Sequence, residues 1–158
     1  ESSMVERDEL SFVEEMGALF ERLSYGRMTG RVWGYLLVVD AEQVSAADLV
    51  EALDSSPSAI STATRVLISL GLVDRIRLSG ERRDHFTIHH GAILSLVRRR
   101  VDALNAARDM AERALTRFGD REIARPHLQE LYDVYSWFAA EYPILVDRFL
   151  DERADQAR

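Results

Sequence analysis

Apolar residues recur every three or four positions along four stretches of this 158-residue chain, the spacing that places them on one face of an α-helix. The pattern predicts helices over residues 6–24, 28–39, 92–118 and about 126–153. The second of these is apolar nearly all round, which is typical of a buried helix. Pro143 lies inside the last stretch, so we expect that helix to bend there or to split in two.

Two shorter helices are predicted between these stretches, over residues 45–53 and 56–70, with a tight turn between them. Ser45 has the side chain and the position of an N-cap for the first helix. The pair Ser56-Pro57 begins the second, because proline suits the first helical position and keeps the residue before it out of the helical conformation. Gly71 follows its last turn, where a left-handed residue commonly ends a helix.

After the second short helix, apolar and polar residues partly alternate over residues 73–78, and an apolar segment follows at 85–88. This pattern predicts two strands, and Gly80 between them favours a hairpin loop. A helix, a tight turn, a second helix and a hairpin form the order of elements in a winged helix-turn-helix. We therefore predict a mainly α protein with a small β-hairpin, in which residues 40–44 are only a polar link.

The second short helix has two different faces. One is apolar and would pack against the first short helix: Ile60, Ala63, Leu67 and Leu70. The other carries small hydroxyl side chains and one arginine: Ser58, Ser61, Thr62, Arg65 and Ser69. A helix in the major groove of DNA needs short side chains to approach the bases, and one arginine can bind guanine with two hydrogen bonds. We predict that this face, with Ser56 at the helix start, contacts DNA; the alternative is a solvated face that is rich in Ser and Thr.

The hairpin loop is the predicted wing. Arg82 and Arg83 lie at its tip beside Gly80, and guanidinium groups both enter narrow minor grooves and bind phosphates. Arg75 and Arg77 on the preceding strand have two interpretations, a phosphate contact or a salt-bridge partner. We include all four arginines in the predicted DNA-binding surface; for the tip, a solvated hairpin loop is the alternative.

The distribution of charge favours the same region. The net charge of the chain is −7, which argues against a protein coated with non-specific affinity for nucleic acid. Residues 55–85 hold five Arg and three acidic residues, giving +2. Residues 1–54 hold four Arg and twelve acidic residues, and residues 86–158 hold eleven Arg and twelve acidic residues. The basic window is therefore the one that contains the second helix of the predicted helix-turn-helix and the wing.

Several classes of protein are disfavoured. The chain has no cysteine, which excludes disulfides, thiolate metal sites and thiol redox switches. It has no run of about 18 apolar residues and no visible signal sequence, so we expect a cytoplasmic protein that does not span a membrane. No Ser-His-Asp arrangement, phosphate loop or paired carboxylate is found, and the four histidines stand at no convincing ligand spacing. We predict no enzymatic activity, no cofactor and no metal.

Five segments carry a resemblance to a known family: GRVWGYLL (30–37), ADLVEAL (47–53), SPSAISTATRVL (56–67), GLVDRI (71–76) and GERRDHF (80–86). Together they resemble the MarR family of transcriptional regulators, and most of all its GbsR-like branch. The resemblance covers about residues 10–90 well, whereas the C-terminal helices match in kind only. It implies a homodimer that binds a double-stranded DNA operator, usually as a repressor that a ligand releases in many members.

The resemblance also divides the chain. It implies an N-terminal dimerisation helix over residues 5–24, a winged helix-turn-helix over 27–90 and a C-terminal helical dimerisation region over 91–153. The long apolar stripes favour a dimer independently, because they exceed what a small winged domain can cover; an intramolecular helical hairpin is the alternative. A winged module that binds only proteins remains a second functional hypothesis, given the acidic total charge.

A small-molecule effector is expected in a cavity where the dimerisation helices meet the winged domain. The available lining groups are aromatic and apolar: Phe12, Met16, Phe20, Trp33, Tyr35, Tyr132, Tyr135, Trp137 and Phe138. Such a set suits a quaternary ammonium group, through cation–π attraction, or an apolar chain. Each residue has an ordinary place in a hydrophobic core as its alternative, so the sequence predicts a pocket and not a particular ligand.

Overall fold

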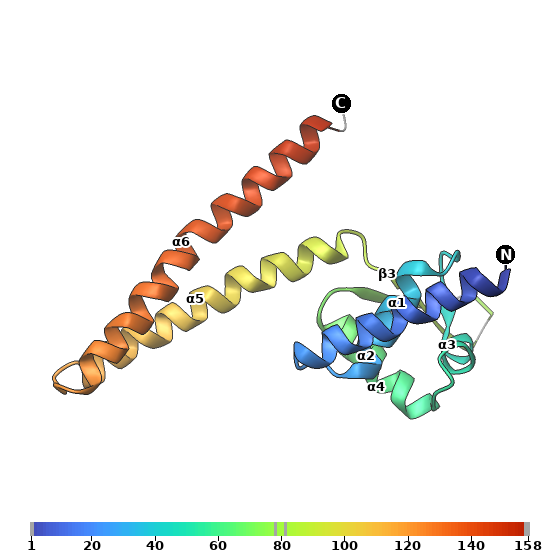
Figure 1. Ribbon diagram of the computed structural model, residues 1–158, viewed down its shortest axis with the longest axis horizontal. Helices are drawn as coiled ribbons and strands as arrows, with labels where there is room; N and C mark the ends of the chain where they lie inside the picture. Colours follow the sequence, from blue (N-terminus) through green and yellow to red (C-terminus); the bar gives the residue numbers. More distant parts are fainter. Residues whose placement is uncertain (1, 78, 81, 157–158) are drawn as a thin grey trace. The chain divides into compact units, whose positions relative to one another are not determined.

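The computed structural model describes the backbone of residues 2–77, 79–80 and 82–156, and the side chains of the same residues from 7 onward. The chain forms two compact units, Glu1–Ser95 and Leu96–Arg158, which are described separately below (Figure 1). The first unit contains α1 (Ser2–Arg22), α2 (Arg27–Val38), β1 (Val44–Ser45), α3 (Ala46–Ala52), α4 (Pro57–Ser69), β2 (Val73–Arg77) and β3 (Asp84–Ile88). The helix α5 (Ala92–Phe118) begins at its end, and α6 (Ala124–Gln156) completes the second unit.

The helix-turn-helix begins and ends where the sequence predicts. The Ser45 side chain accepts a hydrogen bond from the Asp48 amide at 3.1 Å, and the Asp48 carboxylate accepts one from the Ser45 amide at 3.2 Å, which closes a capping box on α3. Ser56 caps α4 by accepting from the Ala59 amide at 3.2 Å. Gly71 follows α4 with φ of 72°, the left-handed conformation that favours glycine.

The sheet has one strand more than the sequence predicted. Residues 40–44 were expected to form only a link, but Val44 and Ser45 form β1, which pairs antiparallel with β3 in the order β1-β3-β2. Two residues are too few to show an alternating pattern, and β1 is stabilised by a partner about 40 positions away. The pairing brings the start of α3 to the base of the wing.

The core of the first unit lies between the helices and the sheet. Its most deeply buried large side chains are aliphatic residues at most 1% exposed: Val13, Val32, Leu49, Leu53, Ile60, Leu67, Leu72 and Val73. The helices α1 and α2 cross very closely at Gly30, where an added Cβ would lie 2.3 Å from the Met16 carbonyl oxygen. A glycine is therefore required at this crossing.

The second unit consists of α5 from Leu96 onward and α6, which diverge from the loop that joins them (Figure 1). Pro143 does not split α6, which is one helix from Ala124 to Gln156; that part of the prediction is wrong. Pro143 cannot donate a hydrogen bond to the Ala139 carbonyl, but several helical turns lie on either side of it. None of the helices, over the residues that the structure describes, combines the length and the apolar character of a membrane-spanning segment.

Candidate nucleic-acid interface

The face of α4 that carries the predicted DNA contacts is exposed. Ser58, Ser61, Thr62, Arg65 and Ser69 are all on the solvent side of the helix. On the other side, Ile60, Ala63 and Leu67 are at most 1% exposed. The division of the helix into a packed face and a hydroxyl-lined face is therefore present in the structure as predicted.

The hydroxyl groups of α4 have different local roles. The Ser56 and Ser58 oxygens lie 3.1 Å apart at the helix start. Thr64 is fully buried and donates to the Ile60 carbonyl at 2.9 Å, so its hydroxyl is satisfied inside the helix and is not available to DNA. Ser61 and Thr62 are exposed, which leaves these two side chains in the middle of the helix on the solvent face with Arg65.

A hollow of about 470 Å³ joins the first half of α4 to the base of the wing. Its walls come from α3, α4 and the hairpin: Ala46, Ala47, Val50, Pro57, Ile60, Ser61, Thr64, Arg75, Arg83, Asp84 and Phe86. It brings Ser61 together with Arg75 and Arg83, which are far from it in the sequence. Arg82 is exposed next to Arg83 in the loop. One predicted helix residue, Ser61, and two predicted hairpin residues, Arg75 and Arg83, thus border the same hollow of the first unit.

Arg75 and Arg77 both form salt bridges with the carboxylate at the start of β3. The Arg75 Nε lies 3.7 Å from Asp84 Oδ2, and the Arg77 Nε lies 3.5 Å from Asp84 Oδ1. Arg75 also lies over the ring of Phe86, with its guanidinium carbon 6.0 Å from the ring centroid. Of the two interpretations that the sequence left open for these arginines, the salt-bridge partner is the one present in the free chain.

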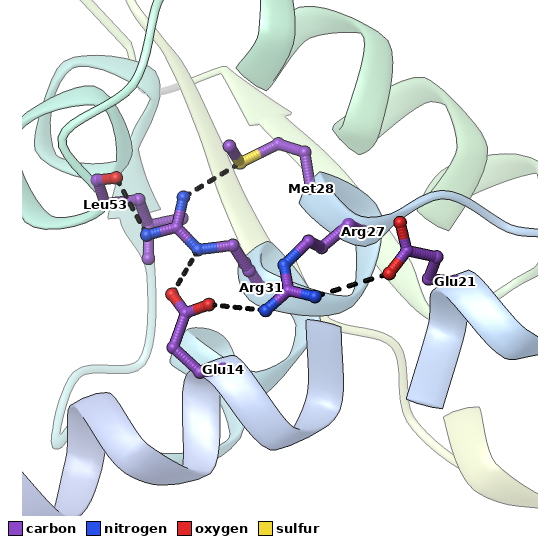
Figure 2. Close-up of polar contacts among 6 residues, drawn as sticks. All are labelled: Glu14, Glu21, Arg27, Met28, Arg31 and Leu53. Carbon is purple, nitrogen blue, oxygen red and sulfur yellow. Dashed lines mark hydrogen bonds and ion pairs between the residues drawn. The ribbon is translucent and has the colours of Figure 1, made fainter. Parts of the chain in front are cut away.

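A second polar cluster, which was not predicted from the sequence, lies at the junction of α1, α2 and the end of α3 (Figure 2). The Arg31 Nε donates to Glu14 at 2.7 Å, and its Nη2 donates to the Leu53 carbonyl at 3.1 Å. Arg27 donates to Glu14 at 3.1 Å and to Glu21 at 3.3 Å. Arg27 and Arg31 are four positions apart on one helix face, which is a signal that the sequence contained.

The cluster holds a carboxylate in its charged form. Burial by itself raises the pKa of Glu14 and is the largest single influence, but the hydrogen bonds and charges of Arg27 and Arg31 together outweigh it. The pKa of Glu14 therefore lies below its ordinary value of 4.5. Arg31 connects this carboxylate to the carbonyl of Leu53, the C-cap residue of α3, which precedes the turn to α4 (Figure 2).

The residues of the predicted effector pocket lie in both units. In the first unit Phe20 and Trp33 are buried in the core, whereas Phe12, Met16 and Tyr35 are half-buried. In the second unit Tyr132 and Tyr135 are half-buried. Trp137 and Phe138 are exposed on α6, with their rings in edge contact at 5.1 Å between centroids. The hollow beside α4 contains none of these residues.

A capped helix-turn-helix with an exposed polar second helix, followed by a small antiparallel sheet with arginines in its loop, defines a winged helix-turn-helix DNA-binding protein. A model of the MarR family matches residues 28–84, and a model of the MmpR5-like MarR family transcriptional regulators matches residues 91–153. The chain belongs to the MarR family of transcriptional regulators, as the relative described next also shows.

That relative is the HTH-type transcriptional regulator MmpR5 of Mycobacterium tuberculosis (strain ATCC 25618 / H37Rv). It is 37% identical over 133 residues, which cover 84% of this chain and 81% of the relative. A solved structure described as the crystal structure of a transcriptional regulator is 34% identical with a TM-score of 0.78, and the match covers 91% of this chain and 99% of that one. The fold predicted from the sequence is confirmed by this likeness.

Proposed function

We propose that this regulator is a cytoplasmic homodimer that binds a specific operator through α4 and its wing and acts as a repressor that a small ligand releases. The observation that carries the proposal is the exposed face of α4, where Ser61, Thr62 and Arg65 are free of core packing. Arg83 borders the same hollow as Ser61, so the helix and the wing are close enough to bind one duplex together.

The exposed face of α4 and the wing offer different chemical groups to DNA. Arg65 is the long cationic side chain on the helix face, and its fork of donors suits the two acceptors of guanine in the major groove. The hydroxyls of Ser58 and Thr62 suit phosphate oxygens or base edges. Arg82 and Arg83 suit phosphates or a narrow minor groove, which contribute affinity for many sequences rather than a choice among them.

The dimer is supported by what the second unit fails to bury. Among its described residues only Ala111 and Ala139 are buried, so α5 and α6 have almost no core of their own. Eight large apolar side chains are 46–83% exposed there: Met110, Ile123, Val134, Trp137, Phe138, Ile144, Leu145 and Phe149. A surface this apolar is typical of an interface with a second chain. Sedimentation equilibrium is the check, and a monomer at every concentration would contradict the dimer.

The proposal also covers the small-molecule effector and the branch of the MarR family to which the chain belongs. Within the first unit, we propose the half-buried members of the predicted set, Phe12, Met16 and Tyr35, as the accessible groups for a quaternary ammonium or an apolar chain. Membership of the GbsR-like branch rests on the GRVWGYLL segment (30–37) and stays a prediction. In the structure Gly30 permits the close crossing of α1 and α2, and Arg31 binds the end of α3.

The test begins with selection of genomic fragments that the purified protein retains, followed by fluorescence anisotropy with one selected fragment and a scrambled duplex of equal length. We expect Arg65→Ala to reduce the ratio of the two affinities by about 5- to 150-fold, the value of one bidentate bond between arginine and guanine. Arg22→Ala, which removes an exposed arginine from the end of α1, is the matched control and should keep the ratio.

The wing is tested on the same two duplexes. Replacing Arg82 and Arg83 by alanine should weaken binding to both and reduce the slope of log K against log salt concentration by about 0.9 for each phosphate that the variant no longer neutralises. Unchanged affinity and slope would show that the wing assignment is wrong. If the wild-type protein binds no fragment even at low salt, the alternative of a winged module that binds only proteins is favoured.

A further inference from the structure

The salt bridges of Asp84 occupy two arginines on the side of the first unit that is assigned to DNA. The register of the hairpin pairs Arg77 with Asp84 and Arg75 with Phe86. Arg75 and Arg77 are two positions apart on β2 and therefore point to the same face of the sheet, where one carboxylate serves both. The Asp84 side chain is 34% exposed, and those of Arg75 and Arg77 are 39% and 80% exposed.

These bridges are loose and incomplete. At 3.5 and 3.7 Å their N–O distances are longer than those of well-formed charge-assisted hydrogen bonds. A phosphate oxygen offers a guanidinium the same kind of anionic acceptor as a carboxylate does. DNA at this face therefore competes with Asp84 for the two arginines. Asp84 also lowers the net charge of the trio Arg75, Arg77 and Asp84 to +1, whereas the two arginines alone would carry +2.

We propose that Asp84 is a residue that determines specificity: it holds Arg75 and Arg77 in the free protein and so restrains their binding to the phosphates of any duplex. Non-specific binding grows with the number of phosphates that are neutralised, so two unrestrained arginines beside α4 would raise the affinity for every sequence. The inference rests on the proposed DNA-binding role of this face, and it adds a carboxylate that works against binding.

The position of the trio supports this role. Arg75 and Asp84 border the hollow that also contains Ser61 of α4 and Arg83 of the wing. A duplex that contacts Ser61 and Arg83 therefore passes close to the carboxylate. The opposite role is an orienting one, in which Asp84 aims the arginines at the phosphates; that role predicts weaker binding when the carboxylate is removed.

The experiment measures binding of the full-length protein to the scrambled duplex and to a selected fragment over a series of salt concentrations. We expect Asp84→Asn to bind the scrambled duplex roughly 2- to 30-fold more tightly, because DNA no longer has to break the two ion pairs of Asp84. The gain is modest because exposed ion pairs cost little to break. The salt slope should become steeper by about 0.9 for each arginine that newly binds a phosphate. Asp74→Asn is the matched control.

Asp74 lies on β2 next to Arg75, and its carboxylate bonds the His89 ring at 2.8 Å. Neutralising it changes the net charge by the same amount as Asp84→Asn without touching the salt bridges of Arg75 and Arg77. A gain that is equal in Asp74→Asn and Asp84→Asn would reflect general repulsion and would overturn the inference. Thermal unfolding of each variant verifies that the hairpin is intact.

A double-mutant cycle gives the second readout. In a protein that carries both Arg75→Gln and Arg77→Gln, the further change Asp84→Asn should give no gain beyond that of Asp74→Asn, because the restrained groups are absent. A gain that persists without the arginines, or a loss of affinity in Asp84→Asn alone, overturns the inference. Wild-type protein that binds no DNA at low salt would refute the proposed function itself, which is a different result from unchanged binding by Asp84→Asn.

Discussion

Arg31 connects α1 to the turn before α4. Its replacement by methionine tests whether this connection stabilises the fold. Methionine keeps an unbranched apolar stem, which packs against α1 near Gly17, where an added Cβ would lie 2.9 Å from the Arg31 Cγ. It removes the guanidinium that donates to Glu14 at 2.7 Å and to the Leu53 carbonyl at 3.1 Å. The substitution therefore deletes polar contacts and conserves most of the packing.

The expected loss follows from the burial of each partner. Leu53 is 1% exposed, so its carbonyl loses a donor where water has little access, at a cost of about 1–3 kcal/mol. The Glu14 side chain is 45% exposed and keeps Arg27 as a partner, so this part of the loss is below about 1 kcal/mol. We expect Arg31→Met to lower the free energy of unfolding by about 1–4 kcal/mol, the sum of the two parts.

Urea denaturation at fixed protein concentration measures this difference, since the concentration affects the stability of a dimer. Arg27→Met is the matched control: it also removes an arginine from Glu14, but its side chain is 47% exposed and the Leu53 carbonyl is not among its partners. We expect a smaller loss for this control. If Arg31→Met is no more destabilising than Arg27→Met, the bond to the Leu53 carbonyl does not contribute as argued.

Two further predictions concern stability. Gly30→Ala should cost at least about 2 kcal/mol in urea denaturation, because its Cβ would lie 2.3 Å from the Met16 carbonyl oxygen. The control Gly80→Ala meets nothing within 4 Å and should cost about 1 kcal/mol, because alanine disfavours the φ of 88° at that position. Equal losses would contradict the close crossing of α1 and α2. Hydrogen bonds from the side chain and backbone of Ser45 lower the pKa of Asp48 below its ordinary 3.8, and the arginines lower the pKa of Glu14. At acidic pH the folded state therefore holds fewer protons on these two carboxylates than the unfolded chain does. This stability is complete above the ordinary pKa values and is lost as the pH falls, so the urea midpoint should decline between about pH 5 and pH 3, and it should decline less in a Glu14→Gln, Asp48→Asn variant.

The elements that the sequence predicted well are those specified by local signals. Ser45 and Ser56 cap their helices through residues three positions away, and Gly71 ends α4 through its own backbone conformation. The faces of α4 follow from a period of 3.6 residues, and the order of elements then indicates the fold. None of these signals depends on a distant part of the chain.

The features that the sequence did not predict depend on distant partners. The strand β1 exists because Val44 pairs with Phe86, and a pair of residues without its partner contains no pattern. The bond from Arg31 to the Leu53 carbonyl joins a side chain to a backbone atom 22 positions away, and backbone acceptors are the same in every residue. The sequence left the roles of Arg75 and Arg77 open for the same reason, since a cross-strand salt bridge requires the register of the hairpin.

In α4, burial separates the residues that stabilise the fold from those that are proposed to contact DNA. Ile60 and Leu67 are at most 1% exposed, so changes there alter packing, whereas Arg65 is exposed and a change there alters what the helix presents to DNA. Arg31 belongs to neither group, because it bonds the Leu53 carbonyl just before the turn that leads to α4. Loss of Arg31 should therefore reduce stability and DNA affinity together, and loss of Arg65 should reduce operator affinity and selectivity at unchanged stability. That contrast distinguishes a residue that positions the helix from one that is proposed to contact the bases.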